Sequence, residues 1–168
     1  LKSKLAPGTR CALEHGGVAP VIVSADADLD DVVERIAKGG FYHAGQVCVS
    51  VQRIFCDRKI VDIFSEKLAE AAGRLKVGDP TKSDTDVGPL ISDKECQRVA
   101  DWVQEAVEGG ATLKTGGKKI SDTCYEPTVL VGADTMAKIS TSEVFGPVVS
   151  IYPYDHVDAA IAEANSLP

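Results

Sequence analysis

The sequence has no apolar run that could cross a membrane as a helix. Its longest apolar stretches, such as Val18–Val23 and Val148–Ile151, are far shorter than the roughly 20 residues that span a bilayer. Basic residues are also in deficit, because 18 Lys and Arg stand against 25 Asp and Glu and give a net charge of -7. Such a charge is repelled by the phosphates of nucleic acids. We therefore expect a domain that binds neither membranes nor nucleic acid.

The sequence also lacks the residue spacings that usually mark a metal site. Its five cysteines form no CxxC pair, and its three histidines form no HxxxH or HExxH pattern, so a zinc site is not expected. The cysteines are Cys11, Cys48, Cys56, Cys96 and Cys124. An odd number of cysteines without a signal-like N-terminus predicts free thiols in a reducing, cytoplasmic setting.

What is present is the composition of an ordinary globular domain. The chain has 168 residues, of which 44% are hydrophobic and 26% are charged, and this is enough for one hydrophobic core. It starts at Leu1, its one methionine is Met136, and it ends at Pro168 directly after a predicted helix. We expect a single domain that is a piece of a longer protein.

Hydrophobic periodicity predicts strands that alternate with helices. The expected strands are Thr9–Glu14, Pro20–Val23, Val49–Cys56, Ala111–Lys114, Pro127–Val131 and Val148–Tyr152, with Gly16-Gly17 as a tight bend after the first. The expected helices cover about 29–41 after an aspartate cap, 60–75, 93–108 after a Ser92 cap, and 155–165, and 77–90 is a long loop. This order predicts an open α/β fold of three layers, in which helices cover both faces of a largely parallel sheet.

Three side chains lie where α/β proteins place reactive groups. Cys48 follows Gly45 on a connection between a helix and a strand, and Glu14 precedes Gly16-Gly17, where it could serve as a general base. Glu143 stands on a loop before a strand and could accept hydrogen bonds from sugar hydroxyls. Each also has a simpler interpretation: an inert buried cysteine, an exposed acid at a strand end, and a solvated loop acid.

Taken together, these segments are similar to a known family. Ala12–Pro20, Ala44–Cys48 and Glu143–Pro147 resemble, in order and spacing, the three signature segments of the NAD(P)-dependent aldehyde dehydrogenase superfamily. Val77–Pro80 and Gly88–Leu90 resemble an intervening loop of that family. The resemblance extends over nearly the whole chain and implies the fold of the family's catalytic domain. The family's cofactor-binding domain and oligomerisation strands have no counterpart in this sequence.

The resemblance implies a role for each candidate residue. Cys48 would be the nucleophile that adds to an aldehyde, with its backbone N–H holding part of the oxyanion, and Glu14 would activate the water that hydrolyses the resulting thioester. Glu143 and Phe145, together with Gly16, would hold the nicotinamide end of NAD or NADP. Hydrolytic release of a carboxylic acid is favoured over transfer to coenzyme A, because the branches that make acyl-CoA usually lack a glutamate at this position. The full-length protein is expected to be a homo-oligomer, and the isolated piece is expected to be inactive.

Two residues depart from the common family pattern, and two other functions stay open. His15 stands where leucine is most common, and His43 stands where asparagine is frequent, five residues before Cys48. A cysteine-dependent hydrolase would pair Cys48 with His43 as thiolate and imidazolium, without a dinucleotide. A non-catalytic interaction domain would keep these motifs without their activity.

Overall fold

Five strands form one sheet in the order β1-β2-β5-β4-β3. The computed structural model describes residues 2–167 and bounds the strands at Pro20–Val23, Arg53–Asp57, Thr112–Thr115, Thr128–Val131 and Val148–Tyr154 for β1 to β5. The pairs β1-β2, β2-β5 and β4-β5 are parallel, and only the edge strand β3 runs antiparallel, against β4. The predicted open α/β fold with a largely parallel sheet is confirmed.

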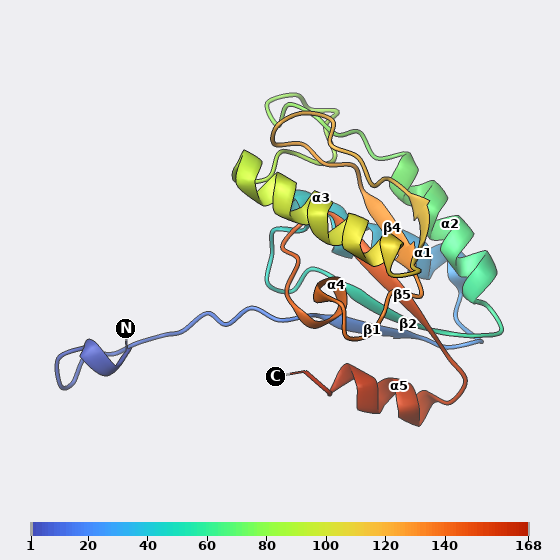
Figure 1. The fold of residues 1–168 in the computed structure, drawn as a ribbon, viewed down its shortest axis with the longest axis horizontal. Coiled ribbons are helices and arrows are strands. Elements are labelled where there is room, and N and C mark those ends of the chain that lie inside the picture. The colour runs from blue at the N-terminus through green and yellow to red at the C-terminus, as the bar shows by residue number, and fades with distance from the viewer. Residues whose placement is uncertain (1, 168) are drawn as a thin grey trace.

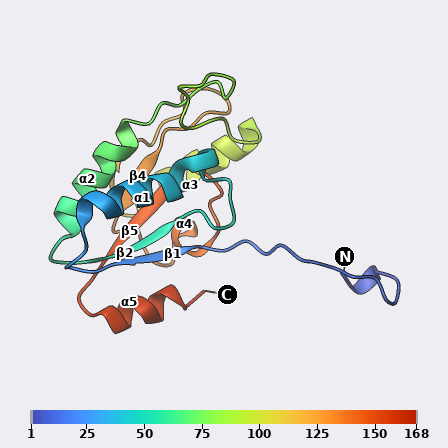
Figure 2. The same ribbon diagram turned by 180° about the vertical axis from the view of Figure 1, so that it is seen from behind.

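Helices cover both faces of this sheet, because parallel strands need crossover connections that pack against the sheet. The α-helices are α1 Leu29–Phe41, α2 Val61–Gly73, α3 Asp93–Glu108, α4 Lys138–Thr141 and α5 Val157–Ala164, and short 3-10 helices occur at Lys2–Lys4 and Tyr42–Gly45. Figure 1 shows α3 in front of the sheet, and Figure 2 shows α1 and α2 in front of it from behind. The two views therefore place α1 and α2 on one face and α3 on the other.

The predicted helix caps are confirmed. Asp28 begins α1 by accepting hydrogen bonds from the N–H groups of Asp30 and Asp31, and Ser92 begins α3 by accepting one from the N–H of Glu95. Gly110, just beyond the end of α3, has φ +103°, a left-handed conformation that suits glycine. The four longer helices were expected; α4 was not, because four residues are too few to show a hydrophobic period.

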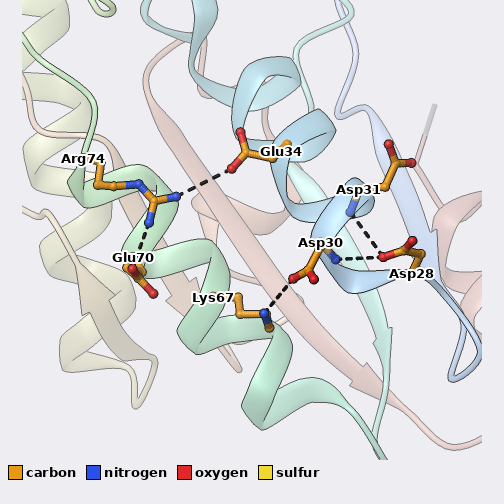
Figure 3. Close-up of polar contacts among 7 residues, drawn as sticks. All are labelled: Asp28, Asp30, Asp31, Glu34, Lys67, Glu70 and Arg74. Carbon is orange, nitrogen blue, oxygen red and sulfur yellow. Dashed lines mark hydrogen bonds and ion pairs between the residues drawn. The ribbon is translucent and has the colours of Figure 1, made fainter.

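Ion pairs join α1 to α2 on the surface of the protein (Figure 3). Lys67 on α2 lies 2.7 Å from a carboxylate oxygen of Asp30 on α1, and Arg74, directly after α2, lies 3.6 Å from one of Glu34. Arg74 also pairs with Glu70 at 2.9 Å. These side chains are largely solvent-exposed, so each pair contributes little to stability. The two helices are held mainly by the buried side chains beneath, such as Ile36 and Leu68.

One predicted strand is absent, and the predicted start of another is wrong. Thr9–Glu14 forms no strand: this segment is exposed, and Figure 1 shows it as an extended arm leaving the sheet. A strand needs a neighbour for its backbone hydrogen bonds, and none lies beside this arm within residues 2–167. Cys11 is therefore exposed on the arm and does not lie in a strand, and residues 15–18 form no turn at Gly16-Gly17.

The second error concerns the start of β2, which begins at Arg53 instead of Val49. The Ser50 hydroxyl donates to the carbonyls of Gly39 and Gly40, and the Val51 N–H donates to the Gly39 carbonyl. These bonds satisfy carbonyl groups at the end of α1, which otherwise have no partner. The segment is thus tied to a helix end and is not available for the sheet.

Candidate functional site

Cys48 lies at the tip of a tightly folded loop between α1 and β2. His43, Ala44 and Gly45 have φ values of 53°, 55° and 69°, so three consecutive residues are left-handed. This conformation costs roughly 1–2 kcal/mol for each residue that is not glycine. A turn closed by the Ser50 N–H and the Val47 carbonyl, 2.9 Å apart, then exposes Cys48. Backbone strain of this kind concentrates at functional sites.

The Gln46 side chain fixes this loop in place. Its amide nitrogen donates to the carbonyls of His43 and Pro89, both at 3.1 Å, and its amide oxygen accepts from the Ile91 N–H at 2.9 Å. One side chain therefore ties the cysteine loop to itself and to the long loop before α3. The segments Ala44–Cys48 and Gly88–Leu90, which the sequence singles out separately, meet here.

The cysteine loop also lies directly against the segment that carries Glu143. A Cβ atom built on Gly45 would lie 2.0 Å from the carbonyl oxygen of Gly146, so only glycine fits at this contact. Val47 and Phe145 border the same small pocket, together with Gly17, Gly45, Gln52 and Glu143. Phe145 has φ +48° and is 42% exposed, and its ring is accessible at the pocket.

Glu143 joins the third predicted segment to this pocket. Its carboxylate accepts a hydrogen bond from the Gly17 N–H at 3.2 Å. A Cβ atom on Gly16 would overlap the same carboxylate, so the glycine pair allows the acid to approach the backbone. The structure therefore brings Gly16, Glu143, Phe145 and the Cys48 loop together from three distant parts of the sequence.

Glu14 lies apart from this cluster. Its side chain is exposed on the arm, and it makes no hydrogen bond with any residue in 2–167. The arm is bonded at Gly17 and where it reaches the sheet: Ala19 accepts hydrogen bonds from the N–H groups of Gln52 and Arg53, and Val18 accepts one from Arg53 Nε at 3.4 Å. Glu14 lies three residues before Gly17 in the sequence.

Two residues that sequence reasoning missed hold the loop of Glu143. Gln52, 5% exposed, bonds the Ile139 carbonyl inside α4 and the Ser142 carbonyl and Val144 N–H of the loop that leads from α4 to β5. Arg98 on α3 donates to the Val144 carbonyl at 2.6 Å while pairing with Glu95 and lying over the Trp102 ring. Gln52 gave no signal, because it is one of the polar residues that alternate with apolar ones in the predicted strand Val49–Cys56. Arg98 gave none, because charged residues on a helix usually face solvent.

Cys56 and Cys96 differ clearly from the exposed Cys48. Cys56 and Cys96 are fully buried, as predicted. Burial raises the pKa of the Cys56 thiol to about 12 and also raises the pKa of Cys96, so both stay protonated and unreactive near neutral pH. The His43 ring is exposed and meets the Tyr42 ring edge-on at 5.1 Å; it makes no hydrogen bond to Cys48.

Residues 2–167 contain no group of three or more His, Cys, Asp or Glu side chains placed to hold a metal ion. None of the helices in that range has both the length and the apolar character needed to span a bilayer.

Comparisons with known proteins agree with this arrangement. The model of the aldehyde dehydrogenase family matches residues 2–168. A 3-sulfolactaldehyde dehydrogenase from Priestia aryabhattai is 43% identical over 156 residues, which are 93% of this chain and 32% of that protein.

Solved structures of the family superimpose closely on this chain. Aldehyde dehydrogenase 21 from Physcomitrella patens, in complex with succinate, matches with a TM-score of 0.85 and 38% identity over 90% of this chain and 32% of its own. A betaine aldehyde dehydrogenase from Staphylococcus aureus, in complex with NAD+, matches with a TM-score of 0.84 and 36% identity over 89% of this chain and 31% of its own.

The chain spans about a third of the length of these relatives. Its match covers the three segments that meet at the pocket, from the Gly16-Gly17 arm to the loop of Glu143. A family model that matches nearly every residue, together with close structural similarity at more than 30% identity, leads to one conclusion. The chain belongs to the aldehyde dehydrogenase family.

Proposed function

We propose that this chain is the catalytic part of an NAD(P)-dependent aldehyde dehydrogenase that converts an aldehyde to a carboxylic acid. The observation that carries the proposal is the meeting of an exposed cysteine loop with a carboxylate and an accessible aromatic ring at one pocket. Neither the cysteine loop alone nor the carboxylate with the aromatic ring alone would indicate this reaction. Gly45 and Val47 of the cysteine loop line this pocket with Glu143 and Phe145, while Cys48 itself is exposed next to Val47. A nucleophile on a loop that borders a carboxylate and an aromatic ring fits a reaction in which a thiol-bound substrate meets a nicotinamide cofactor.

The residues at the pocket fit the nicotinamide end of NAD or NADP. Glu143 is half-buried, and its carboxylate accepts one hydrogen bond, from the Gly17 N–H. Further lone pairs of this carboxylate are available for ribose hydroxyl groups. Phe145 offers an exposed ring that can border the nicotinamide. Gly16 leaves the space that a side chain would take from Glu143. When bound, NAD(P)+ supplies the acceptor for the hydride of the substrate.

Cys48 performs the covalent steps. Its thiolate adds to the aldehyde carbon, forming a C–S bond, and the carbonyl oxygen becomes an oxyanion. The Cys48 N–H has no acceptor within residues 2–167, which leaves it available to this oxyanion. Oxidation leaves a thioester on Cys48. Glu14 removes a proton from water, the water attacks the thioester, and the carboxylic acid and the free thiol are released.

The domain organisation, location and assembly of the protein form part of the same proposal. We infer that residues 1–168 are one catalytic domain of a longer protein, and that other segments of it supply the binding site for the adenosine end of the cofactor. Five free thiols support a cytoplasmic location, where thiols stay reduced. The full-length protein is proposed to be a homo-oligomer, which light scattering of the purified protein would test.

The substitution Cys48→Ser in the full-length protein tests the proposed reaction. Because a hydroxyl is a far weaker nucleophile than a thiolate, aldehyde-dependent formation of NAD(P)H should fall at least 1,000-fold, on the order of 4 kcal/mol in the barrier. Cys11→Ser is the matched control, since Cys11 is also exposed but lies on the arm; it should retain activity. Activity of Cys48→Ser within a few-fold of the parent would refute the assignment.

Thiol alkylation separates this function from the two alternatives. An aldehyde dehydrogenase or a Cys48/His43 hydrolase should show one fast-reacting cysteine, at position 48, whereas an interaction domain should show equal, slow labelling of Cys48 and Cys11. In a hydrolase, the labelling rate of Cys48 should depend on pH through the protonation of His43. This pH dependence should disappear in His43→Gln. We expect no such dependence on His43. The His43 ring contacts the Tyr42 ring, and among the described residues it forms no hydrogen bond to Cys48.

A further inference from the structure

We propose that Gln52 is a positioning residue that holds Glu143 in its cofactor-binding place. The side-chain amide nitrogen donates to the carbonyls of Ile139 at 3.0 Å and Ser142 at 2.8 Å. The amide oxygen accepts from the Val144 N–H at 2.9 Å. Glu143 therefore lies between two backbone groups that Gln52 fixes.

These three bonds involve both the donor and the acceptor group of the amide. An amide side chain has two N–H donors and an oxygen acceptor, and here both kinds of group are satisfied by backbone. Gln52 is 5% exposed, so solvent cannot replace a lost partner easily. Loss of the amide would remove a partner from three backbone groups, one in α4 and two in the loop that follows it, and buried groups without partners are costly. The loop is expected to shift in order to recover them.

The backbone of Gln52 connects the same point to two other segments. Its N–H donates to the Ala19 carbonyl at 3.1 Å, where the arm with Gly16-Gly17 reaches the sheet, and its carbonyl accepts from the Ser150 N–H of β5 at 2.8 Å. Gln52 also follows Cys48 by four residues in the chain. One residue therefore connects the arm, β5 and the loop of Glu143.

A second tether limits what the loss of Gln52 would disturb. Arg98 holds the Val144 carbonyl at 2.6 Å independently of Gln52. The backbone at Val144 should thus stay beside α3 when the amide is removed, and the Ser142 N–H keeps its bond to the Lys138 carbonyl. Glu143, between these two points, becomes free to move. This movement would break the 3.2 Å contact between Glu143 and Gly17 and leave the nucleophile loop, which Gln46 holds, in place.

The catalytic consequence of this inference rests on the proposed function. It is tested with Gln52→Met in the full-length protein, which keeps the length of the side chain and removes all three bonds. We expect the KM for NAD(P)+ to rise at least tenfold, while kcat, the KM for aldehyde and the alkylation rate of Cys48 stay within threefold. Gln104→Met is the matched control, because Gln104 is exposed on α3 and donates only to Glu108; it should change none of these values.

Hydrogen exchange gives a readout that does not depend on activity. The Val144 amide, which donates to Gln52, should exchange at least tenfold faster in Gln52→Met. The amides of the strands β2 and β5 should change little.

An unchanged cofactor KM together with unchanged exchange would overturn the inference. Faster exchange throughout the sheet, with kcat and both KM values changed alike, would also overturn it, since it would mean a general structural role. If the parent protein forms no NAD(P)H from any aldehyde, the proposed function fails, and the exchange of the Val144 amide still decides the role of Gln52.

Discussion

The exposed carboxylate of Glu14 permits a prediction that separates the two halves of the reaction. Glu14→Gln in the full-length protein removes the base that activates water and leaves Cys48 and the pocket unchanged. We expect one equivalent of NAD(P)H per active site to form in a burst, after which turnover falls at least 100-fold and an acyl adduct on Cys48 accumulates. Rapid-mixing absorbance and intact-protein mass spectrometry measure these two quantities.

The control for this experiment is Glu66→Gln, because Glu66 is an exposed acid on α2, away from the pocket. It should turn over like the parent. A steady rate in Glu14→Gln equal to that of the parent, without an adduct, would assign the base to another residue.

Gly45 and Gly132 allow strain and steric contact to be measured separately. Their φ values are +69° and +70°, but a Cβ atom on Gly132 would have no neighbour within 4 Å, whereas on Gly45 it would meet Gly146. Gly132→Ala should lower the free energy of unfolding by about 1–2 kcal/mol, the cost of the left-handed backbone. Gly45→Ala should cost a further ~1–3 kcal/mol, because the contact must open. Urea unfolding of the two variants measures the difference; equal losses would mean that the contact is not tight.

At the scale of the helices, Figure 3 shows two kinds of polar contact at α1: the Asp28 cap at its start and the ion pair between Asp30 and Lys67. Asp28 accepts hydrogen bonds from two N–H groups at the start of α1, at 3.1 and 3.4 Å, and Asp28→Ala should lower the free energy of unfolding by roughly 0.5–2 kcal/mol. Lys67→Ala removes the exposed pair with Asp30 and should cost at most about 1 kcal/mol. Thermal melts in low and high salt distinguish the two, since high salt should abolish the effect of Lys67→Ala only. A larger loss for Lys67→Ala would contradict the prediction.

The helices were predictable because their apolar residues repeat with the helical period and their caps are visible in the sequence. Asp28 and Ser92 begin helices where expected. Strands were less predictable, since a strand exists only where a neighbour pairs with it. Thr9–Glu14 has the composition of a strand but no neighbour, and Val49 is in a turn because Ser50 and Val51 bond the end of α1.

The same reasoning explains which parts of the site were missed. Cys48, Glu14, Gly16, Glu143 and Phe145 were predicted from local motifs and their resemblance to a family. The tethers of Gln52 and Arg98 connect residues 46 to 92 positions apart in the sequence, and no local pattern reports such pairs.

For the molecule as a whole, we predict that the isolated 168-residue chain folds but does not catalyse. Folding is expected because the sheet has helices on both faces and one continuous buried core. Cofactor binding is not expected, because Glu143 and Phe145 reach only the nicotinamide end, and two hydrogen bonds of about 1 kcal/mol each cannot offset the several kcal/mol lost on association.

A thermal melt and an NAD(P) titration of this chain check the prediction. A cooperative melt without saturable binding at millimolar cofactor is the expected result. Micromolar binding, or NAD(P)H formed from an aldehyde, would show that the chain holds a complete cofactor site.

The central position of β5 has a consequence for how the protein is made. β5 is the last strand in residues 2–167, yet it lies between β2 and β4. During translation, β1-β2 and β3-β4 can only form as separate pairs, each with an open edge that β5 will later fill. A ribosome adds about 5–20 residues per second, so the 90 residues between β2 and β5 take on the order of 5–20 s. For that time the nascent chain presents the unpaired edge of β2, joined by the edge of β4 once Val131 has been added. Chaperones that bind extended, apolar segments should therefore associate with ribosomes that have not yet passed Tyr154.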